Sequence, residues 1–459
     1  MNIQSLKHVY FIGIGGIGMS AIARYFYSLG IKVSGYDKTP TELTSALVEE
    51  GMNIHFDDNE KRVPEDVDLV VYTPAIPADH LGLQLVKKKG IPLMKRAQVL
   101  GLISTSRYCI AIAGTHGKTT TSTLTAHVMF ACGMDPSAFL GGISVNTNSN
   151  YMAGKSDFVV LEADEFDRSF LFLEPDIAAI MSMDADHLDI YGKHEDMLTG
   201  FVQFARKIKV GGHLLIKSGL LTHFSAEDLN FLENRNIKIR VFGEKNADLF
   251  VTNVLVRDGK FYFDLTWEGE TTRNWETNLP GKHNVENASV AIAIGMMTEG
   301  KTDDIRNALR SFAGIKRRFE FIFKSESKVY IDDYAHHPTE LNAAISGVKM
   351  LYPDKKITGI FQPHLYSRTR DFYEGFAEAL DRLDEIFLME IYPARELPIE
   401  GVTSSLIFEK MKNRNKKLVS KINLMDNLDW ENLEVLVTLG AGDIDTFVPK
   451  ISEKLNKIK

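Results

Sequence analysis

Two glycine-rich turns constrain what this chain can fold into, because each joins an apolar run to a helix-like segment. The first, Gly13-Ile14-Gly15-Gly16-Ile17-Gly18, lies between a predicted strand at 8–14 and a predicted helix at 19–29. Glycines at such a turn let a helix N-terminus approach a diphosphate. Asp37 ends the next predicted strand, where its carboxylate can accept a hydrogen bond from a nucleotide hydroxyl or base. Taken alone, this pattern indicates a dinucleotide site. A turn that needs glycine only for packing is the alternative, and the nucleotide is left open.

The second turn has the residue types of a phosphate-binding loop. It follows the predicted strand 107–113 and reads Gly114, Thr115, His116, Gly117, Lys118, Thr119 and Thr120. In such a loop backbone N–H groups surround the phosphates, the lysine reaches the β and γ oxygens, and the hydroxyl after it binds Mg²⁺. The usual eight-residue form would have glycine at Ile112, so this loop is shorter. We therefore predict a nucleoside triphosphate site.

Acidic residues follow the next two predicted strands, at 157–162 and 177–183. They are Glu162, Asp164, Glu165 and Asp186, with His187 beside the last. Residues just past the ends of parallel strands face the crevice where ligands bind, and carboxylates there suit Mg²⁺. Helix N-capping is an equally good reading of Asp164, Glu165 and Asp186. The residue type alone makes His187 a hydrogen-bonding or substrate-orienting group.

Composition excludes several classes of protein. The chain has 459 residues, 44% of them hydrophobic and 25% charged, with a net charge of −8. This balance favours neither nucleic acid nor a membrane surface as a partner. Two cysteines, Cys109 and Cys132, allow no disulfide framework. The apolar N-terminal stretch imitates a signal peptide, but its glycines and the strand-like run after it favour a cytoplasmic protein.

The pattern of short apolar runs and amphipathic segments predicts an α/β protein with parallel sheets. Alternating residues at 250–256 and 260–267 around Asp258-Gly259 predict an antiparallel hairpin. A third unit starts near 313–319, with predicted strands at 329–331, 357–361, 385–390 and 434–439. The basic tail from 450 to 459 predicts a terminal helix.

Four motifs, in this order, resemble those of the Mur ligases, the ATP-dependent amino-acid ligases of peptidoglycan synthesis. They are the loop 114–120, Gly281-Lys282-His283-Asn284-Val285-Glu286-Asn287, Arg317-Arg318-Phe319-Glu320 and Asp332-Asp333-Tyr334-Ala335-His336-His337-Pro338. The N-terminal loop with Asp37, and the run from Phe361 to Phe372, resemble the branch that joins L-alanine to UDP-N-acetylmuramate. A branch that adds a whole peptide to the same sugar nucleotide is the nearest alternative within the family.

The resemblance implies three domains: a Rossmann-like UDP-sugar domain at 1–104, a central P-loop ATP domain at 105–313, and a Rossmann-like amino-acid domain at 314–459. It implies that the first loop holds the UDP diphosphate and that Asp37 lies near the uridine, with Thr73, Ala75 and Arg96 bordering the UDP-sugar. Lys118 and Thr119 would bind the γ-phosphate and Mg²⁺, with Glu162 and His187 as further metal ligands. For ATP the implied residues are Asn284 and Asn287 at the adenine, Arg318 at a phosphate and Asp333 at the ribose, and for the amino acid His336, Arg368 and Arg370.

The activity implied is ligation through an acyl phosphate, with Lys118, His187, His336 and Arg318 as catalytic residues and ATP and Mg²⁺ as cofactors. We expect a monomer or a weak homodimer, and a hinge at 311–315 that closes the site. Two other classes remain open from the residues alone. One is an NAD-dependent oxidoreductase, which leaves the second loop unexplained, and the other is a binding module that ATP gates without catalysis.

Overall fold

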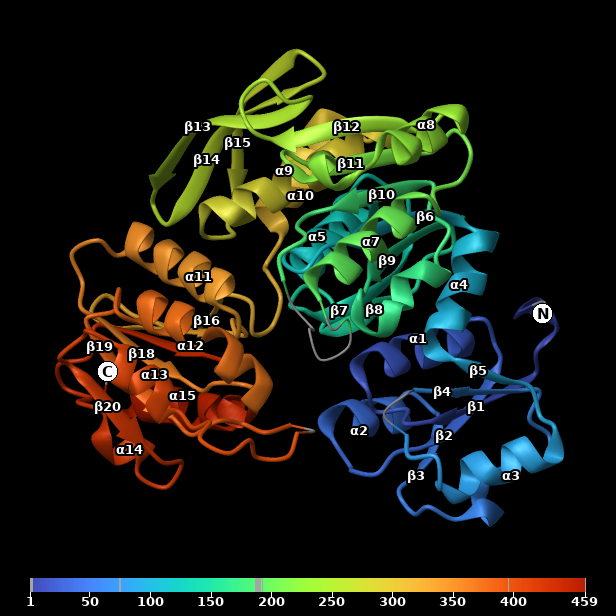
Figure 1. The fold of residues 1–459 in the computed structure, drawn as a ribbon, viewed down its shortest axis with the longest axis horizontal. Coiled ribbons are helices and arrows are strands. Elements are labelled where there is room, and N and C mark those ends of the chain that lie inside the picture. The colour runs from blue at the N-terminus through green and yellow to red at the C-terminus, as the bar shows by residue number, and fades with distance from the viewer. Residues whose placement is uncertain (1–2, 74–75, 186–190, 192, 395, 459) are drawn as a thin grey trace. The chain divides into compact units, whose positions relative to one another are not determined.

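The computed structural model describes residues 3–73, 76–185, 191, 193–394 and 396–458 (Figure 1). The chain divides into two compact units. The first contains residues 1–251, 265–271 and 287–312, and the second contains 252–264, 272–286 and 313–459. The division between 312 and 313 falls within the segment where the sequence predicts a hinge.

The first sheet is parallel and has the strand order β3-β2-β1-β4-β5. Its strands are β1 (His8–Ile12), β2 (Lys32–Tyr36), β3 (Asn53–His55), β4 (Leu69–Tyr72) and β5 (Leu93–Lys95). Its helices are α1 (Ile17–Ser28), α2 (Glu42–Glu49), α3 (Leu81–Lys89) and α4 (Arg96–Ser106). The chain leaves β1 toward β2 on one side and returns to β4 on the other. Ligands of open parallel sheets bind at such a reversal, beyond the carboxyl end of the central strand. The first glycine loop lies there.

A second sheet of ten strands has the order β15-β14-β13-β12-β11-β10-β6-β9-β7-β8. The strands nearest the second glycine loop are β6 (Tyr108–Ala113), β7 (Ser137–Ser144), β8 (Ser149–Met152), β9 (Phe158–Ala163) and β10 (Ile177–Ile180). The others are β11 (His213–Lys217), β12 (Lys238–Gly243), β13 (Leu249–Arg257), β14 (Lys260–Trp267) and β15 (Glu270–Thr277). Strand β6 runs parallel to both neighbours, β9 and β10, so the loop after it meets the acidic segments that follow those strands.

The predicted hairpin is confirmed. Asp258 and Gly259 join β13 to β14, and both have positive φ angles, 54° and 74°. Two successive residues with positive φ match the right-handed twist of a two-residue hairpin, which is why Asp-Gly favours this turn. The sequence analysis did not predict the hairpin of β7 and β8.

Helices α5 (Lys118–Ala131), α7 (His194–Ala205), α8 (Ala226–Asn234), α9 (Lys282–Met297) and α10 (Thr302–Ser311) accompany the second sheet. Helix α1 of the first sheet packs against its β7 and β8. The ring of Tyr25 lies 5.4 Å from that of Phe139, and the Asn150 side chain bonds to the Ile17 carbonyl and the Ser20 hydroxyl. Residues of the two sheets thus contribute to one hydrophobic core cluster.

The third sheet has the order β16-β17-β21-β18-β19-β20 and is parallel except for β16. Its strands are β16 (Glu320–Lys324), β17 (Val329–Asp333), β18 (Ile357–Phe361), β19 (Glu385–Met389), β20 (Lys416–Val419) and β21 (Val435–Leu439). Its helices are α11 (Pro338–Leu351), α12 (Tyr366–Leu380), α13 (Ser405–Lys410), α14 (Leu424–Asn427) and α15 (Val448–Lys457). Helix α15 confirms the predicted terminal helix. Asp333 and Phe361 both pair with Leu439, so the segments after β17 and β18 leave the same edge of the sheet on either side of β21.

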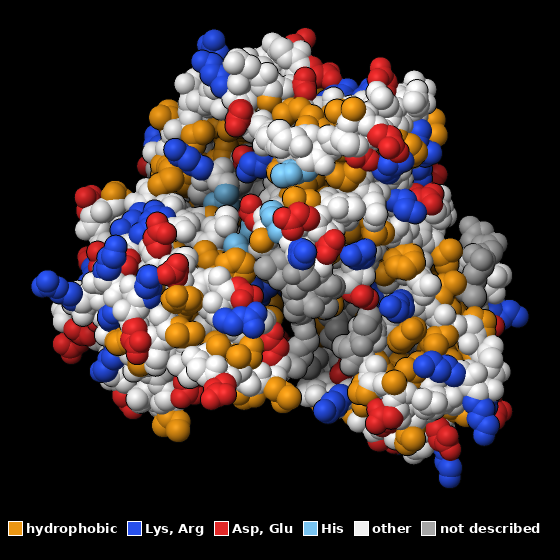
Figure 2. Space-filling view, viewed as in Figure 1, with side chains coloured by type: hydrophobic (Ala, Val, Ile, Leu, Met, Phe, Trp, Pro, Cys, Tyr) orange, Lys and Arg blue, Asp and Glu red, His pale blue; other side chains and the backbone are white. Residues whose placement is uncertain are grey.

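Within the described residues, no helix has both the length and the apolar character that crossing a membrane would need. On the face shown in Figure 2, Lys and Arg side chains are interspersed with Asp and Glu side chains, as the net charge of −8 suggests.

Candidate functional site

The first glycine loop is shaped by hydrogen bonds from its own backbone. Gly13 and Ile14 donate their N–H groups to the Tyr36 carbonyl, at 2.8 and 3.0 Å. The Gly15 N–H donates to Oδ2 of Asp37 at 2.7 Å, and a Cβ at position 15 would lie only 2.8 Å from that oxygen. Asp37 therefore lies directly at the loop, and glycine at 15 allows its carboxylate to approach.

Arg96 lies against the end of the same loop. A Cβ at Gly18 would lie 2.4 Å from Nη1 of Arg96, and Nη2 of Arg96 lies 3.3 Å from Oδ2 of Asp164. Thr73 lies on the other side, with its methyl group 3.1 Å from where a Cβ of Gly13 would be. The structure thus brings Asp37, Arg96 and Thr73 to one loop, whereas Ala75 lies outside the described residues.

The second loop ends on helix α5, which begins at Lys118 and is preceded by Gly117 with a φ of 83°. A Cβ at Gly117 would lie 2.8 Å from Oδ1 of Asn287, so this predicted adenine contact lies beside the loop. Thr119 and Thr120 lie in the first turn of α5. Ser182, which follows β10, accepts a hydrogen bond from the His116 N–H at 2.7 Å and bonds to the Thr115 hydroxyl at 2.9 Å.

The Lys118 ammonium pairs with a carboxylate. Its Nζ lies 2.9 Å from Oε1 and 2.7 Å from Oε2 of Glu165, and it also donates to the Gly114 carbonyl at 2.5 Å. The Lys118 side chain is 12% exposed and that of Glu165 is 0% exposed. Burial by itself would lower the pKa of Lys118. The negative charges of Glu165, Asp164 and Glu162 outweigh it, so the pKa lies above its ordinary value.

Two of the three predicted metal ligands, Thr119 and Glu162, lie within the described residues. Oε2 of Glu162 accepts a hydrogen bond from the Gly141 N–H at 3.1 Å. Thr119 supplies a hydroxyl at the start of α5. A carboxylate and a hydroxyl fit Mg²⁺, which takes few protein ligands and completes its shell with water and phosphate oxygens. No group of three or more acidic, His or Cys side chains within the described residues could hold a metal without such help. His187 and Asp186 lie outside the described residues.

Asp333 and Arg318 lie together in the second compact unit. The Asp333 carboxylate accepts the N–H groups of Phe319 and Ala335, both at 2.7 Å. Burial raises the pKa of Asp333 to about 7, although Arg318 and the two N–H donors act to lower it. The Arg318 guanidinium lies 5.0 Å from the centre of the Tyr334 ring. Asn284, also in this unit, is buried and donates to the Pro280 carbonyl at 2.7 Å.

His336 and Arg368 belong to one polar cluster at the end of β17 and β18. Nδ1 of His336 donates to the Tyr334 carbonyl at 2.9 Å and lies 3.2 Å from Oε2 of Glu340. Nη1 of Arg368 donates to Nδ1 of His364 at 3.3 Å, and the His336 and His364 rings are 6.0 Å apart. A carbonyl oxygen can only accept, so Nδ1 of His336 carries a proton, and in the neutral form of the ring the lone pair is on Nε2.

Arg370 does not join this cluster. Both arginines lie on α12, but residues two apart on a helix do not face each other. Arg368 is 6% exposed, whereas the Arg370 side chain is 54% exposed and bonds to Asp371 at 2.7 Å. The two guanidiniums therefore lie in different surroundings, one buried and one at the surface.

The sequence analysis missed Ser182 and Glu340 and did not predict that Glu165 pairs with Lys118. Glu340 connects two predicted residues, because its other oxygen lies 3.8 Å from Nη1 of Arg318. Its spacing of four residues from His336, across the start of a helix, is the one signal that could have shown it. Ser182 and Glu165 are far from the loop in the sequence, and they contact it because the order of the strands brings their segments beside it.

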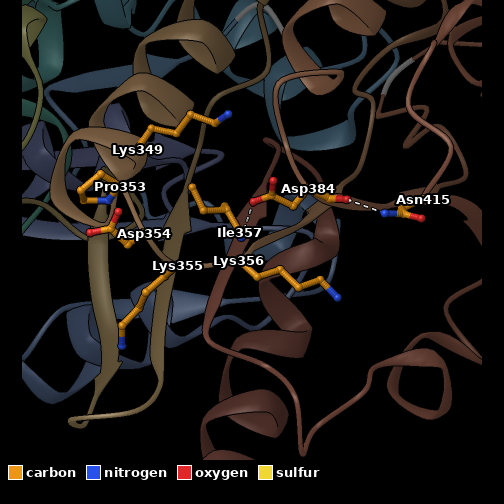
Figure 3. A pocket seen from close by; sticks show the side chains of 8 residues that line it. All are labelled: Lys349, Pro353, Asp354, Lys355, Lys356, Ile357, Asp384 and Asn415. Carbon is orange, nitrogen blue, oxygen red and sulfur yellow. Dashed lines mark hydrogen bonds between the residues drawn. The ribbon is translucent and has the colours of Figure 1, made fainter.

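A hollow of about 560 Å³ in the second unit lies away from the polar cluster of His336 and Arg368 in the same unit (Figure 3). Its lining consists of Lys349, Pro353, Asp354, Lys355, Lys356, Ile357, Asp384 and Asn415. It lies at the amino end of β18, whereas the cluster above follows the carboxyl ends of β17 and β18. The hollow is therefore at the opposite end of β18 from the candidate site.

Comparisons with known proteins cover the whole chain. Residues 8–108 match the catalytic domain of the Mur ligase family, 112–295 the Mur ligase middle domain, and 317–444 the Mur ligase glutamate ligase domain. A protein of Flavobacterium johnsoniae named UDP-N-acetylmuramate–L-alanine ligase is 47% identical over 461 residues, with 100% of both chains covered.

Two solved structures share the fold. A UDP-N-acetylmuramate–alanine ligase of Thermotoga maritima has a TM-score of 0.82 at 27% identity, covering 98% of this chain and 100% of that one. A murein peptide ligase of Psychrobacter arcticus has a TM-score of 0.67 at 22% identity, with 98% of both chains covered. The second likeness bears on the fold alone.

Proposed function

The chain belongs to the Mur ligase family, and from that premise we propose that it joins L-alanine to the lactyl carboxylate of UDP-N-acetylmuramate, using ATP, in peptidoglycan precursor synthesis. The observation that carries this proposal is the full-length similarity to a ligase of that name, at 47% identity. It includes the N-terminal and C-terminal domains, to which we assign the UDP-sugar and the amino acid, respectively.

ATP is needed because a carboxylate is a poor electrophile and hydroxide a poor leaving group. The lactyl carboxylate attacks the γ-phosphorus, so that an acyl phosphate forms and ADP leaves. The amine of L-alanine then attacks the acyl carbon and phosphate leaves. Lys118 and Arg318 neutralise negative charge during phosphoryl transfer, which depends mostly on positioning and electrostatics. Asn284, Asn287 and Asp333 hold the adenosine part of ATP.

The first glycine loop binds the UDP diphosphate at the N-terminus of α1. Gly13, Gly15, Gly16 and Gly18 let the backbone come close to the phosphates. We assign the nucleotide to Asp37 and an anionic group of the substrate to Arg96, because both residues lie at this loop. Thr73 and Ala75 border the sugar.

His336 and Arg368 act on the amino acid. The buried Arg368 guanidinium binds the L-alanine carboxylate, since a planar fork suits that group better than an ammonium does. Nε2 of His336 is a candidate to accept the proton that the amine loses, with a water or a phosphate oxygen as the alternative. Arg370 stays a predicted contact of the same substrate.

Thr119 and Glu162 would hold Mg²⁺, with His187 as a predicted third ligand. The bound ion would neutralise charge on the phosphate oxygens during transfer.

The test is a measurement of phosphate release with each combination of ATP, UDP-N-acetylmuramate and L-alanine. Sustained release that needs both other substrates supports the proposal. Release from ATP alone, or a change in NADH absorbance when NAD⁺ is offered, would contradict it. Replacing L-alanine by a peptide tests the alternative activity of the family.

A further inference from the structure

The Lys118 ammonium has all three of its N–H donors engaged. The Gly114 carbonyl and the Glu165 carboxylate lie at 2.5–2.9 Å, whereas the Thr115 carbonyl is 3.4 Å away. An arriving phosphate oxygen can therefore replace the weakest partner, Thr115, and leave the other two in place. The two short contacts then fix the position of Nζ.

Glu165 is itself held rigidly. Its backbone carbonyl accepts hydrogen bonds from the Tyr191 hydroxyl at 2.6 Å and from the Arg168 N–H at 3.0 Å. The turn continues through Asp167 and Arg168, which have φ angles of 52° and 54°. Non-glycine residues keep this left-handed conformation only where their surroundings impose it.

A carboxylate after a strand ordinarily either caps the following helix or faces solvent, and Glu165 does neither. Its side chain makes no capping hydrogen bond to the short helix that begins after it. Both carboxylate oxygens lie within 3 Å of the ammonium and the side chain has no exposed surface, so it faces the lysine.

We propose that Glu165 is a positioning residue, which holds the Lys118 ammonium against the Gly114 carbonyl with its third N–H directed to the transferred phosphoryl group. The proposal rests on the function proposed above. It has a second consequence, because the Lys118–Glu165 pair has a net charge of zero. A neutral pair attracts a diphosphate less strongly than a lone ammonium does, so ADP leaves more readily after each cycle.

Glu165→Gln separates these effects, because it keeps the shape of the side chain and removes its charge. We expect ADP to bind at least about tenfold more tightly, since an unneutralised ammonium then faces the diphosphate. We expect kcat to fall at least about tenfold, since the ammonium is no longer fixed for the transition state. If the Glu165 carboxylate only supported the local structure of the loop, ADP binding would instead weaken while kcat falls. The measurements are calorimetric titration with ADP and turnover at saturating substrates.

Asp176→Asn is the matched control. Asp176 pairs with Lys209 at 2.8 Å, and that lysine also donates to a carbonyl, of Arg107, at 2.7 Å. This pair lies at the amino ends of β6 and β10, at the opposite edge of the sheet from the phosphate loop. The control should leave both ADP affinity and kcat within about twofold of wild type.

Unchanged ADP affinity in Glu165→Gln, or weaker binding together with lower kcat, would overturn the proposal. If Glu165→Gln does not fold, Glu165→Asp decides, since it keeps the charge and withdraws the carboxylate by one carbon. It should bind ADP as wild type does and turn over more slowly, and full kcat would refute the role. The ADP titration needs neither other substrate, so tighter ADP binding without any ligation would contradict the proposed function alone.

Discussion

Gly141→Ala should slow the reaction without unfolding the protein. Gly141 lies in β7, and a Cβ there would be 2.3 Å from Oε1 and 2.4 Å from Oε2 of Glu162. Carbon–oxygen contacts in proteins are ordinarily 3.4 Å or more, so the carboxylate must move by about 1 Å. The obstacle is the far end of a side chain, and the backbone at 141 does not have a positive φ angle. The fold can therefore accept the methyl group by moving Glu162.

The magnitude follows from that displacement. A misplacement of about 1 Å at a reacting centre costs about 10²-fold in rate, which is about 2.7 kcal/mol of transition-state stabilisation. Because Glu162 is the proposed metal ligand, the loss should be accompanied by a higher half-saturating concentration of Mg²⁺. The melting temperature should stay close to that of wild type, since no buried contact is removed.

The assay is turnover at saturating ATP, UDP-N-acetylmuramate and L-alanine over a range of Mg²⁺ concentrations. Gly200→Ala is the control, because a Cβ at that position in α7 would meet nothing closer than 3.5 Å. Wild-type turnover with a wild-type Mg²⁺ dependence in Gly141→Ala would refute the role given to Glu162.

Four further predictions concern other parts of the site. Lys118→Ala should lose at least about 3 kcal/mol of transition-state stabilisation, measured as kcat/KM for ATP, and near-normal turnover would refute its role. Arg368→Ala should raise the KM for L-alanine about 10²-fold, as expected for a buried charged contact, whereas Arg370→Ala should change it less than about threefold. Burial raises the pKa of Asp333 from 3.8 to about 7, so the stability that its protonation contributes is present below about pH 4 and is lost as the pH rises to about 7. An ionised carboxylate accepts hydrogen bonds from ribose hydroxyls better than a protonated one, so ADP affinity should fall as the pH drops through 7. The Asp333→Asn variant should abolish that pH dependence. Closure about residues 311–315 should change the X-ray scattering curve when nucleotide and sugar substrate bind together, and identical curves would count against the hinge.

Much of the site could be predicted because its parts are contiguous in the sequence. The turn from Gly114 to Thr120 needs only a strand before it and a helix after it, and the structure has both in β6 and α5. The same holds for the loop from Gly13 to Gly18 and for the Asp258-Gly259 hairpin. In each case local backbone geometry imposes the residue types, so the sequence pattern contains the information.

Such sequence patterns could not distinguish between two residues of the same type that lie close together in one motif. Arg368 and Arg370 are equivalent in the motif, yet one is buried against His364 and the other is paired with Asp371 at the surface. The burial of each arginine depends on which face of α12 packs against the sheet. That face is set by packing across the whole domain.

The sequence alone thus determined two glycine-rich turns, each between a strand of a parallel arrangement and a helix, and it predicted the cations and acids that we assign to them. Only the tertiary structure decided which charges meet. Lys118 and Glu165 are 47 residues apart, and they pair because β6 lies beside β9 in the sheet. Spacing along the chain governs contacts within one turn, whereas strand order governs contacts between turns, and strand order follows from burying the apolar surface of the whole unit.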